Sequence, residues 1–467
     1  MAISPARSAA FDILLQVERQ DAYASELLHS SRYAKLAKAD HGLATEIVMG
    51  VLRWRSLLDA ELGRFSSQKL PKLDAEVLTS VRMAVFQLMM LDRVPAHAVL
   101  HDSVELVKRA RKRSAAPFVN ALLRKVSGHA EWIADLRQTV GELAKAPNTS
   151  STPTVTVTHR PSPEPSVKYF AYRYAHPHWM VERWVKAYGM KKALEVLRWD
   201  QQVPTTAIHL PALEDESSLE KSGVILLNGA LLKTAARVES GDLTRTEAFQ
   251  SGRIVIQDEA SQLVARLVGS GERILDCCAA PGGKTLLIAE RNPAARIVAS
   301  ELHSHRARLL RKRVADNHVE VVAADIRESP FRGDFDRVLA DVPCSGTGTL
   351  QRNPEIKWRL SRQDLRDLQA KQVAILTSAM KYASPQGRVI YSTCSLEPEE
   401  NEAVVEKALA ADASFQIRDC RAELELLQKS GELAWTDLDS LLSGPFLRTI
   451  PGVHPCDGFF AAILEKK

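Results

Sequence analysis

Residues 274–285 read as a strand, a glycine-rich turn and the start of a helix, and few folds accommodate that order. The stretch is ILDCCAAPGGKT. Glycines let the backbone approach a ligand closely, and the following helix N-terminus favours polar or anionic ligand groups. In open α/β sheets, ligands bind beyond the carboxyl ends of the strands. The stretch therefore predicts a parallel sheet with a ligand site at this edge.

Two nucleotide-binding motifs are excluded at this turn. A Walker A loop needs a glycine five residues before Gly283, and that position is Cys278. The dinucleotide fingerprint G-x-G-x-x-G is also absent. An enzyme that uses ATP is therefore disfavoured.

Acidic residues follow the next two predicted strands. Glu301 ends the strand-like run that starts at Arg296, 18 residues after Gly283, where an acid binds ribose hydroxyls in nucleotide folds. Asp325 ends the run that starts at Val321, and we expect it near an adenine amino group. Together with the turn, this resembles the S-adenosylmethionine site of class I methyltransferases. The expected cofactor residues are Cys278, Ala279, Ala280, Pro281, Gly282, Gly283, Lys284, Glu301 and Asp325.

Two cysteines lie in similar short contexts. Cys344 follows the apolar run 337–340, and Cys394 follows the run 388–390. Both runs read as buried parallel strands that end in loops, where catalytic groups collect. Two thiols, with Asp341 three residues before the first, indicate covalent chemistry with a nucleophile and a helper. Two buried structural cysteines are the alternative.

The composition is that of an ordinary soluble protein, with 467 residues, 45% of them hydrophobic and 25% charged. The first 140 residues hold 20 Lys and Arg against 15 Asp and Glu, which accounts for the whole net charge of +5 and permits a polyanionic partner. Six cysteines without small-domain spacing predict reduced thiols, no metal and a cytoplasmic location. We find no signal peptide, and no apolar run reaches the roughly 18 residues of a membrane helix.

Residues 1–142 read as an all-helical domain. Apolar residues recur at helical spacing, for example in 10–17 and 77–88. A basic run at 108–113 is a candidate RNA contact, and a solvated face is the alternative. Residues 143–167 hold five prolines among serine and threonine and predict a linker.

Residues 168–253 predict a small α+β subdomain, with strand-like runs at 205–210 and 224–227. Aromatic and basic side chains alternate at its start, which suits stacking on unpaired bases. The alternative is an amphipathic helix, and we favour that alternative for Trp179 and Trp184.

Residues 254–467 alternate strands and helices, which predicts a mostly parallel sheet. Within this region, residues 421–447 read as an insertion-like stretch, and 456–464 read as a late strand.

Six stretches of the chain resemble the bacterial 16S ribosomal RNA cytosine-C5 methyltransferases of the Sun/Fmu type. The resemblance covers almost the whole length. It implies an all-α NusB-like N-terminal domain, a small α+β RNA-binding subdomain and an α/β Rossmann-like class I methyltransferase core. Three departures are Glu301, where the family usually has Asp, His209, where it often has Arg, and the Pro-rich linker, which is longer than expected. The matching stretches are Gln257–Ser261, Cys278–Lys284, Asp341–Ser345, Arg352–Trp358, Thr393–Ser395 with Pro398–Asn401, and Asp457–Phe460.

The resemblance also implies a reaction. By this resemblance, the enzyme methylates carbon 5 of a cytosine in 16S ribosomal RNA that is unassembled or partly assembled, and S-adenosylmethionine is the methyl donor. Cys394 is implied as the nucleophile that adds to carbon 6, and Cys344 as the residue that assists product release. Asp341 is implied to hold a proton against N3 and to contribute to the cofactor site. Because an ordinary cysteine has a pKa of about 8.5, the site has to favour the thiolate.

Two other functions stay open from the sequence. The same catalytic core would serve a methyltransferase that acts on a cytosine of transfer RNA or another RNA. A non-enzymatic RNA-binding regulator would need only the N-terminal domain, and the two cysteine loops argue against it.

Overall fold

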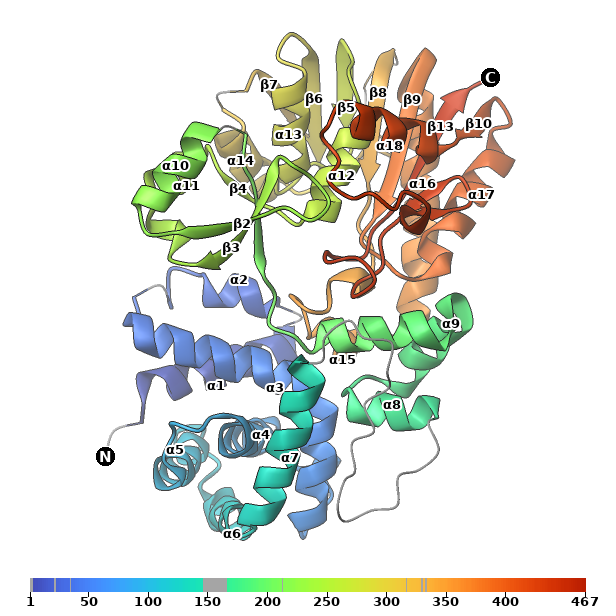
Figure 1. Ribbon diagram of the computed structural model, residues 1–467. Helices are drawn as coiled ribbons and strands as arrows, with labels where there is room; N and C mark the ends of the chain where they lie inside the picture. Colours follow the sequence, from blue (N-terminus) through green and yellow to red (C-terminus); the bar gives the residue numbers. More distant parts are fainter. Residues whose placement is uncertain are drawn as a thin grey trace. The chain divides into compact units, whose positions relative to one another are not determined.

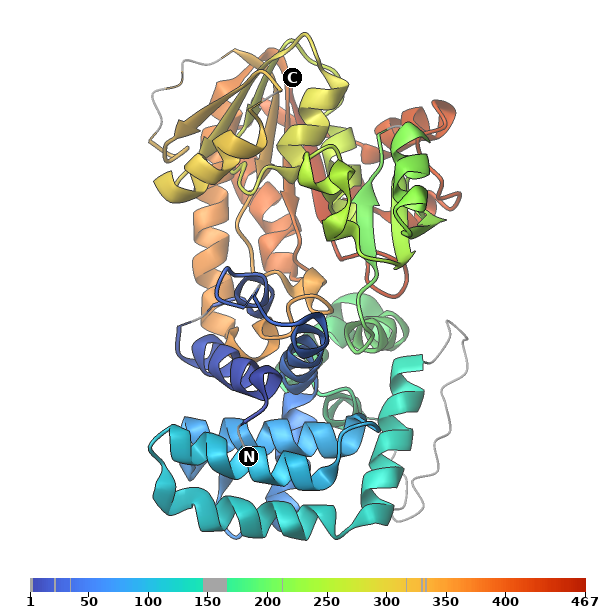
Figure 2. The same ribbon diagram turned by 90° about the vertical axis from the view of Figure 1, so that its left-hand side faces the viewer.

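The computed structural model describes residues 3–20, 22–33, 35–145, 166–211, 213–315, 317–328, 331 and 334–467. Most of the predicted linker lies outside them. The chain forms two compact units (Figures 1 and 2). The first unit comprises Met1–Val203 and Leu350–Arg359, and the second comprises Pro204–Thr349 and Leu360–Lys467. The finer boundaries expected at 142, 167 and 253 stay predictions.

The first unit is helical throughout the part that is described, and the helical prediction for residues 1–142 is confirmed there. Trp184 is buried in its core, as favoured from the sequence. No helix among the described residues is long and apolar enough to cross a membrane. The helices are α1 (Pro5–Gln20), α2 (Ala24–Leu28), α3 (Lys38–Phe65), α4 (Ala75–Met90), α5 (Ala96–Arg109), α6 (Ala116–Ser127), α7 (Ala130–Lys145), α8 (Val167–Arg173), α9 (His178–Asp200) and α15 (Ile356–Arg359).

The segment Leu350–Arg359 completes the first unit although it comes from far along the chain. Lys357 is 1% exposed, and its Nζ donates to the backbone oxygens of Arg53 at 2.9 Å and Ala175 at 3.1 Å. The indole of Trp358 donates to the oxygen of Leu52 at 2.6 Å. Burial lowers the pKa of Lys357 to about 7. This segment is therefore part of the core of the first unit.

The second unit contains a small antiparallel sheet with the strand order β2-β3-β1-β4. Both strand-like runs expected between residues 205 and 227 are confirmed. Its elements are β1 (Thr206–His209), α10 (Leu213–Lys221), β2 (Ile225–Asn228), β3 (Ala235–Ser240), α11 (Glu247–Gln250) and β4 (Val255–Ile256).

Among the residues that the structure describes, the large sheet of the second unit has nine strands. Five of them, β7-β6-β5-β8-β9, are parallel, and β10 to β13 pair antiparallel beyond β9. Its elements are α12 (Glu259–Leu267), β5 (Arg273–Asp276), α13 (Gly283–Arg291), β6 (Arg296–Glu301), α14 (Ser304–Arg313), β7 (Val319–Ala323), β8 (Phe335–Asp341), α16 (Arg362–Tyr382), β9 (Ala383–Thr393), α17 (Glu402–Ala411), β10 (Phe415–Arg418), α18 (Cys420–Lys429), β11 (Leu442–Ser443), β12 (Phe446–Arg448) and β13 (Phe460–Lys466).

Residues 421–447, which read as an insertion-like stretch in the sequence, supply most of α18 and β12 and all of β11. The strand β12 pairs with β13, and Leu447 is buried in the core. The expected late strand is β13.

Alternate residues of the central strands face two cores, because successive side chains of a strand point to opposite faces. Ile274 and Leu339 belong to the core beneath α12, α13 and α18, and Leu275 and Val338 belong to the core beneath α16 and α17. Helices therefore cover both faces of the parallel strands, as continuous apolar runs predict.

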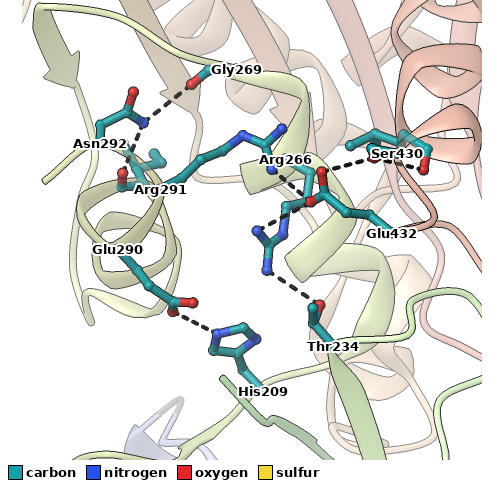
Figure 3. Close-up of polar contacts among 11 residues, drawn as sticks. His209, Thr234, Arg266, Gly269, Glu290, Arg291, Asn292, Ser430 and Glu432 are labelled. Atoms are coloured by element: carbon teal, nitrogen blue, oxygen red, sulfur yellow. Dashed lines mark hydrogen bonds and ion pairs between the residues drawn. The ribbon is translucent and has the colours of Figure 1, made fainter. Parts of the chain in front are cut away.

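Charged side chains join the small sheet to the helices of the large one (Figure 3). His209 on β1 is 2% exposed, and its Nε2 lies 2.6 Å from Oε2 of Glu290 on α13. Arg266 on α12 donates to Thr234 Oγ1 at 3.2 Å and lies 3.4 Å from Glu432. His209 is thus a buried link within the second unit and has no exposed face for RNA.

We predict that Lys357→Met changes how stability depends on pH. The folded pKa of Lys357, about 7, lies below the value of about 10.4 for an unfolded chain. Between these values the unfolded state binds more protons, so the contribution of Lys357 to stability rises with pH. The free energy of unfolding of the wild type relative to Lys357→Met should rise by roughly 1–2 kcal/mol from pH 7 to pH 8.5.

Denaturation followed by tryptophan fluorescence measures this effect, because six of the seven tryptophans lie in the first unit. Lys191→Met removes an exposed lysine of α9 and serves as the control. A pH-independent difference between wild type and Lys357→Met would contradict the prediction.

Candidate active site

The glycine-rich turn follows β5 and leads into α13, as the sequence predicts. Gly282 adopts a φ of +103°, a conformation that other residues rarely take. A Cβ at this position would lie 2.7 Å from Cδ1 of Leu310 on α14. The amide of Ala279 donates to the oxygen of Ser300 at 2.9 Å, which fixes the turn against the end of β6. Only glycine at 282 therefore allows the turn to pack this closely.

Asp276 supplies a buried acceptor at the end of β5. Its side chain is 1% exposed, and Thr285 Oγ1 donates to Oδ2 at 2.7 Å. Its Oδ1 is buried without a partner among the described residues. Burial raises the pKa of Asp276 to about 7. Because buried polar atoms are nearly always hydrogen-bonded, this oxygen marks a place for a donor group of a ligand.

The two acids expected at the cofactor site lie at the same edge of the sheet. Glu301 ends β6 and is buried, and its Oε1 accepts from the amide of His303 at 2.9 Å. Asp325 lies two residues beyond β7, and the Arg327 side chain donates to both of its oxygens. Hydrogen bonds from Arg327 lower the pKa of Asp325.

The two cysteine loops meet because β8 and β9 are adjacent. Asp341 pairs with Ser392 in the parallel register, so both loops start at the same level. The Sγ atoms of Cys344 and Cys394 lie 3.3 Å apart. The contact with Cys394, together with burial, raises the pKa of Cys344. Cys344 is therefore held as a protonated thiol beside Cys394.

Asp341 connects the cysteine strands to the glycine-rich turn. Lys284 Nζ lies 2.8 Å from Oδ2 of Asp341, and Ser392 Oγ donates to Oδ1 at 2.7 Å. The ammonium of Lys284 also lies 4.9 Å from the centre of the Phe459 ring. Lys284 and Asp341, expected at one site, are thus in direct contact.

Glu400 was not singled out from the sequence, and it binds both cysteine loops. It is 0% exposed. Its carboxylate accepts from the amide and hydroxyl of Ser345, from the Ser395 hydroxyl at 2.5 Å and from Gln372 Nε2 at 2.8 Å. Ser345 and Ser395 directly follow the two cysteines. The only sequence signal for this role was that Glu400 lies in the stretch 398–401, which resembles the family.

Gly348 permits close backbone contacts beside the two cysteine loops. Its amide donates to the oxygen of Cys394 at 2.9 Å, and its oxygen accepts from the amide of Gly458 at 2.8 Å. A Cβ on Gly348 would lie 2.2 Å from the oxygen of Gly458. The stretch 457–460 therefore closes over the cysteine loops backbone to backbone.

One of the stretches that resemble the family, residues 352–358, belongs to the first unit, and Lys357 packs in the core of that unit as described above. All six cysteines are free. Among the described residues, no cluster of three or more His, Cys, Asp or Glu side chains is arranged to hold a metal ion.

The parallel sheet, its glycine-rich turn and the acids after the following strands define a class I methyltransferase core, here joined to a helical unit. Comparisons with known families agree. Residues 267–465 match the family described as 16S rRNA methyltransferase RsmB/F, and residues 4–128 match the NusB family. The chain belongs to the RsmB/F family of 16S rRNA methyltransferases and carries a NusB-family domain.

Curated relatives match the chain over nearly its full length. A putative methyltransferase of Mycobacterium tuberculosis is 32% identical over 99% of this chain and 97% of its own. A probable ribosomal RNA small subunit methyltransferase B of Bacillus subtilis is 29% identical over 99% of this chain and 98% of its own.

Solved structures share the fold. The crystal structure of PH0851 has a TM-score of 0.75 and 22% identity, and it covers 100% of both chains. That of NSun6 from Pyrococcus horikoshii with SFG has a TM-score of 0.53 and 19% identity, and it covers 63% of this chain and 99% of its own.

We predict that Glu400→Ala loosens both cysteine loops. The substitution leaves the Ser345 amide and two hydroxyls without their acceptor. Since one hydrogen bond to a charged group is worth about 1.5–3 kcal/mol, alkylation of Cys344 and Cys394 by iodoacetamide should become about tenfold faster. Mass spectrometry of the alkylated peptides measures the rates.

Glu406→Ala removes an exposed carboxylate of α17 and is the control, for which wild-type rates are expected. Equal alkylation rates in Glu400→Ala and the wild type would show that Glu400 does not hold the loops.

Proposed function

We propose that this protein methylates carbon 5 of a cytosine in 16S ribosomal RNA, with S-adenosylmethionine as the methyl donor. The observation that carries the proposal is the 3.3 Å approach of the Cys344 and Cys394 Sγ atoms at the edge that also holds the glycine-rich turn. Carbon 5 of cytosine is a poor nucleophile, and a thiolate that adds to carbon 6 activates it. A pair of thiols beside a methyl-donor site suits that chemistry.

The cofactor residues proposed are those of the turn, Cys278, Ala279, Ala280, Pro281, Gly282, Gly283 and Lys284, together with Glu301, Asp325 and Asp341. The residues at this edge of the sheet fit S-adenosylmethionine. The unpartnered Oδ1 of Asp276 can accept from an amino group, and the left-handed Gly282 removes a side chain where a ligand would approach. S-adenosylmethionine supplies an electrophilic methyl carbon when it is bound. The buried carboxylate of Glu301 at the end of β6 suits ribose hydroxyls.

Cys394 is the proposed nucleophile, and Cys344 assists release. The thiolate of Cys394 would add to carbon 6 and put an electron pair on carbon 5. Carbon 5 would then bond to the methyl carbon while the bond between that carbon and the donor sulfur breaks, which leaves S-adenosylhomocysteine. The carbon-5 proton then leaves to a base, and the bond between carbon 6 and sulfur breaks to return the thiolate. Cys344, whose raised pKa keeps it a thiol, lies within 3.3 Å to assist this elimination.

Asp341 is proposed to hold a proton against N3 of the ring while charge develops. Lys284 and Ser392 fix both of its oxygens. For this role, the Lys284 contact has to give way or share its proton when the base enters.

The substrate is proposed to be 16S ribosomal RNA before or during its assembly, which places the enzyme in the cytoplasm. Family membership supports ribosomal RNA, and the NusB-family domain supports an RNA contact. Incubation of unmodified 16S ribosomal RNA with the protein and S-adenosylmethionine, followed by bisulfite sequencing, tests this. One protected cytosine is the expected result. Protection of transfer RNA and not of 16S ribosomal RNA would favour the alternative substrate.

The two thiols should fail differently when they are removed. Cys394→Ala cannot form the bond to carbon 6, so we expect neither methyl transfer nor a covalent species. In Cys344→Ala, Cys394 still attacks carbon 6, but the methylated RNA is released slowly. We therefore expect a covalent protein–RNA adduct that migrates as a retarded band on a denaturing gel. An adduct in Cys394→Ala with none in Cys344→Ala would reverse the assignment, and adducts in neither would leave both cysteines structural.

Glu301→Ala should weaken S-adenosylmethionine binding by roughly 1–3 kcal/mol, because hydrogen bonds to a charged acceptor are lost. Titration calorimetry on the full chain measures the affinity. Glu320→Ala on β7, an exposed acid paired with Arg296, is the control and should bind as the wild type does. If Glu301→Ala binds S-adenosylmethionine with wild-type affinity, the assignment of Glu301 to the ribose hydroxyls is wrong.

A further inference from the structure

Helix α14 is a concentrated source of positive charge in the second unit (Figure 1). Its ten residues, SHRARLLRKR, include five Arg and Lys and no acid. Beyond residue 140, basic and acidic residues balance at 42 each. The excess of basic residues on α14 is therefore a local feature of a region whose formal net charge is zero.

The basic residues of α14 face solvent. The helix buries Ala307 and Leu310 against the sheet, while Arg308 and Lys312 are exposed. Leu309 is 64% exposed within the same basic surface, and Leu302, just before the helix, is 53% exposed. Arginine is one of the residues enriched where proteins contact other molecules.

Arg306 of α14 lies 3.8 Å from Glu301, but two other basic residues of the helix have no such partner in the described part of the chain. No carboxylate pairs with Arg308 or Lys312 among the residues that the structure describes. Arg311 donates to a backbone carbonyl, that of Val321. Arg308 and Lys312 are four residues apart on one helix, where like charges destabilise it. The helix thus keeps a repulsive pair that a purely structural role does not require.

The N-terminal end of α14 lies at the catalytic edge. The helix starts just beyond the carboxyl end of β6, the edge at which β8 and β9 carry the cysteine loops. Three strand spacings separate β9 from β6, about 14 Å at roughly 4.8 Å each. Leu310 also lies against the glycine-rich turn at Gly282. A polyanion whose base lies at the thiols would reach α14 with phosphates a short distance along its strand.

We propose that the exposed face of α14, formed by Arg308, Leu309, Lys312 and the preceding Leu302, binds the phosphate backbone of the 16S ribosomal RNA substrate. This rests on the proposed function. The charge complementarity selects a polyanion, and the leucines pack against sugar or base faces between the phosphates. The catalytic unit then contributes its own RNA affinity, in addition to any from the NusB-family domain.

The test is Arg308→Glu combined with Lys312→Glu, measured for binding to an unmodified 16S ribosomal RNA transcript over a range of salt concentrations. Each phosphate contact contributes roughly 0.7–0.9 to the slope of log affinity against log salt. Losing two contacts should make that slope shallower by about 1.5 and weaken binding at low salt by about tenfold or more. Affinity for S-adenosylmethionine should not change.

The matched control is Lys381→Glu with Lys407→Glu, which makes the same charge change on exposed residues of α16 and α17. In this control, the slope of log affinity against log salt should stay closer to the wild-type value than in the α14 variant. Arg308→Gln with Lys312→Gln, which introduces no new acid, should give a smaller loss in the same direction and guards against misfolding of the charge-reversed helix.

The outcomes separate this proposal from the proposed function. If the wild type binds and methylates the transcript and the α14 variants match it in affinity and slope, α14 is not the RNA surface, and an acidic protein becomes the alternative partner. If the wild type neither binds nor methylates 16S ribosomal RNA, the proposed function itself is wrong.

Discussion

The parallel pairing of β8 with β9 decides where the reactive groups of the second unit lie. Because Asp341 and Ser392 are in register, both loops leave the sheet at one level and their thiols meet. The backbone hydrogen bonds between β8 and β9 do not by themselves hold the loops that extend beyond the strands. The buried carboxylate of Glu400 does so, since it accepts hydrogen bonds from the residue after each cysteine. A single acid therefore converts two adjacent strand ends into one rigid pair of thiols.

The strands and their terminal acids were predictable because they depend on local pattern. Short apolar runs that end in Glu301 or that precede the Cys344 loop identify buried parallel strands without knowledge of the rest of the chain. The glycine-rich turn was predictable for the same reason, since Gly282 is needed for a backbone conformation that its own sequence signals.

Glu400, His209 and the stretch 352–358 could not be placed from the sequence. The side chain of Glu400 turns back toward two loops that precede it in the chain, and no periodicity encodes such a return. His209 is buried because Glu290 from another layer of the second unit reaches it. Residues 352–358 stand between two elements of the methyltransferase core in sequence, yet the side chains of Lys357 and Trp358 donate to α3 and to the loop before α9. In each case the partner is remote, and only the folded chain identifies it.

The inclusion of Leu350–Arg359 in the first unit has a consequence for how this chain is made. At a synthesis rate of about 5–20 residues per second, residue 359 follows residue 203 from the ribosome by roughly 10–30 s. During that interval the helices of the first unit exist without Lys357, which is buried in their core, and without Trp358, whose indole donates to Leu52 of α3. Completion of the N-terminal half must therefore wait until β8 and its loop have been translated, so a nascent chain halted before that point exposes an unfilled core to chaperones and proteases.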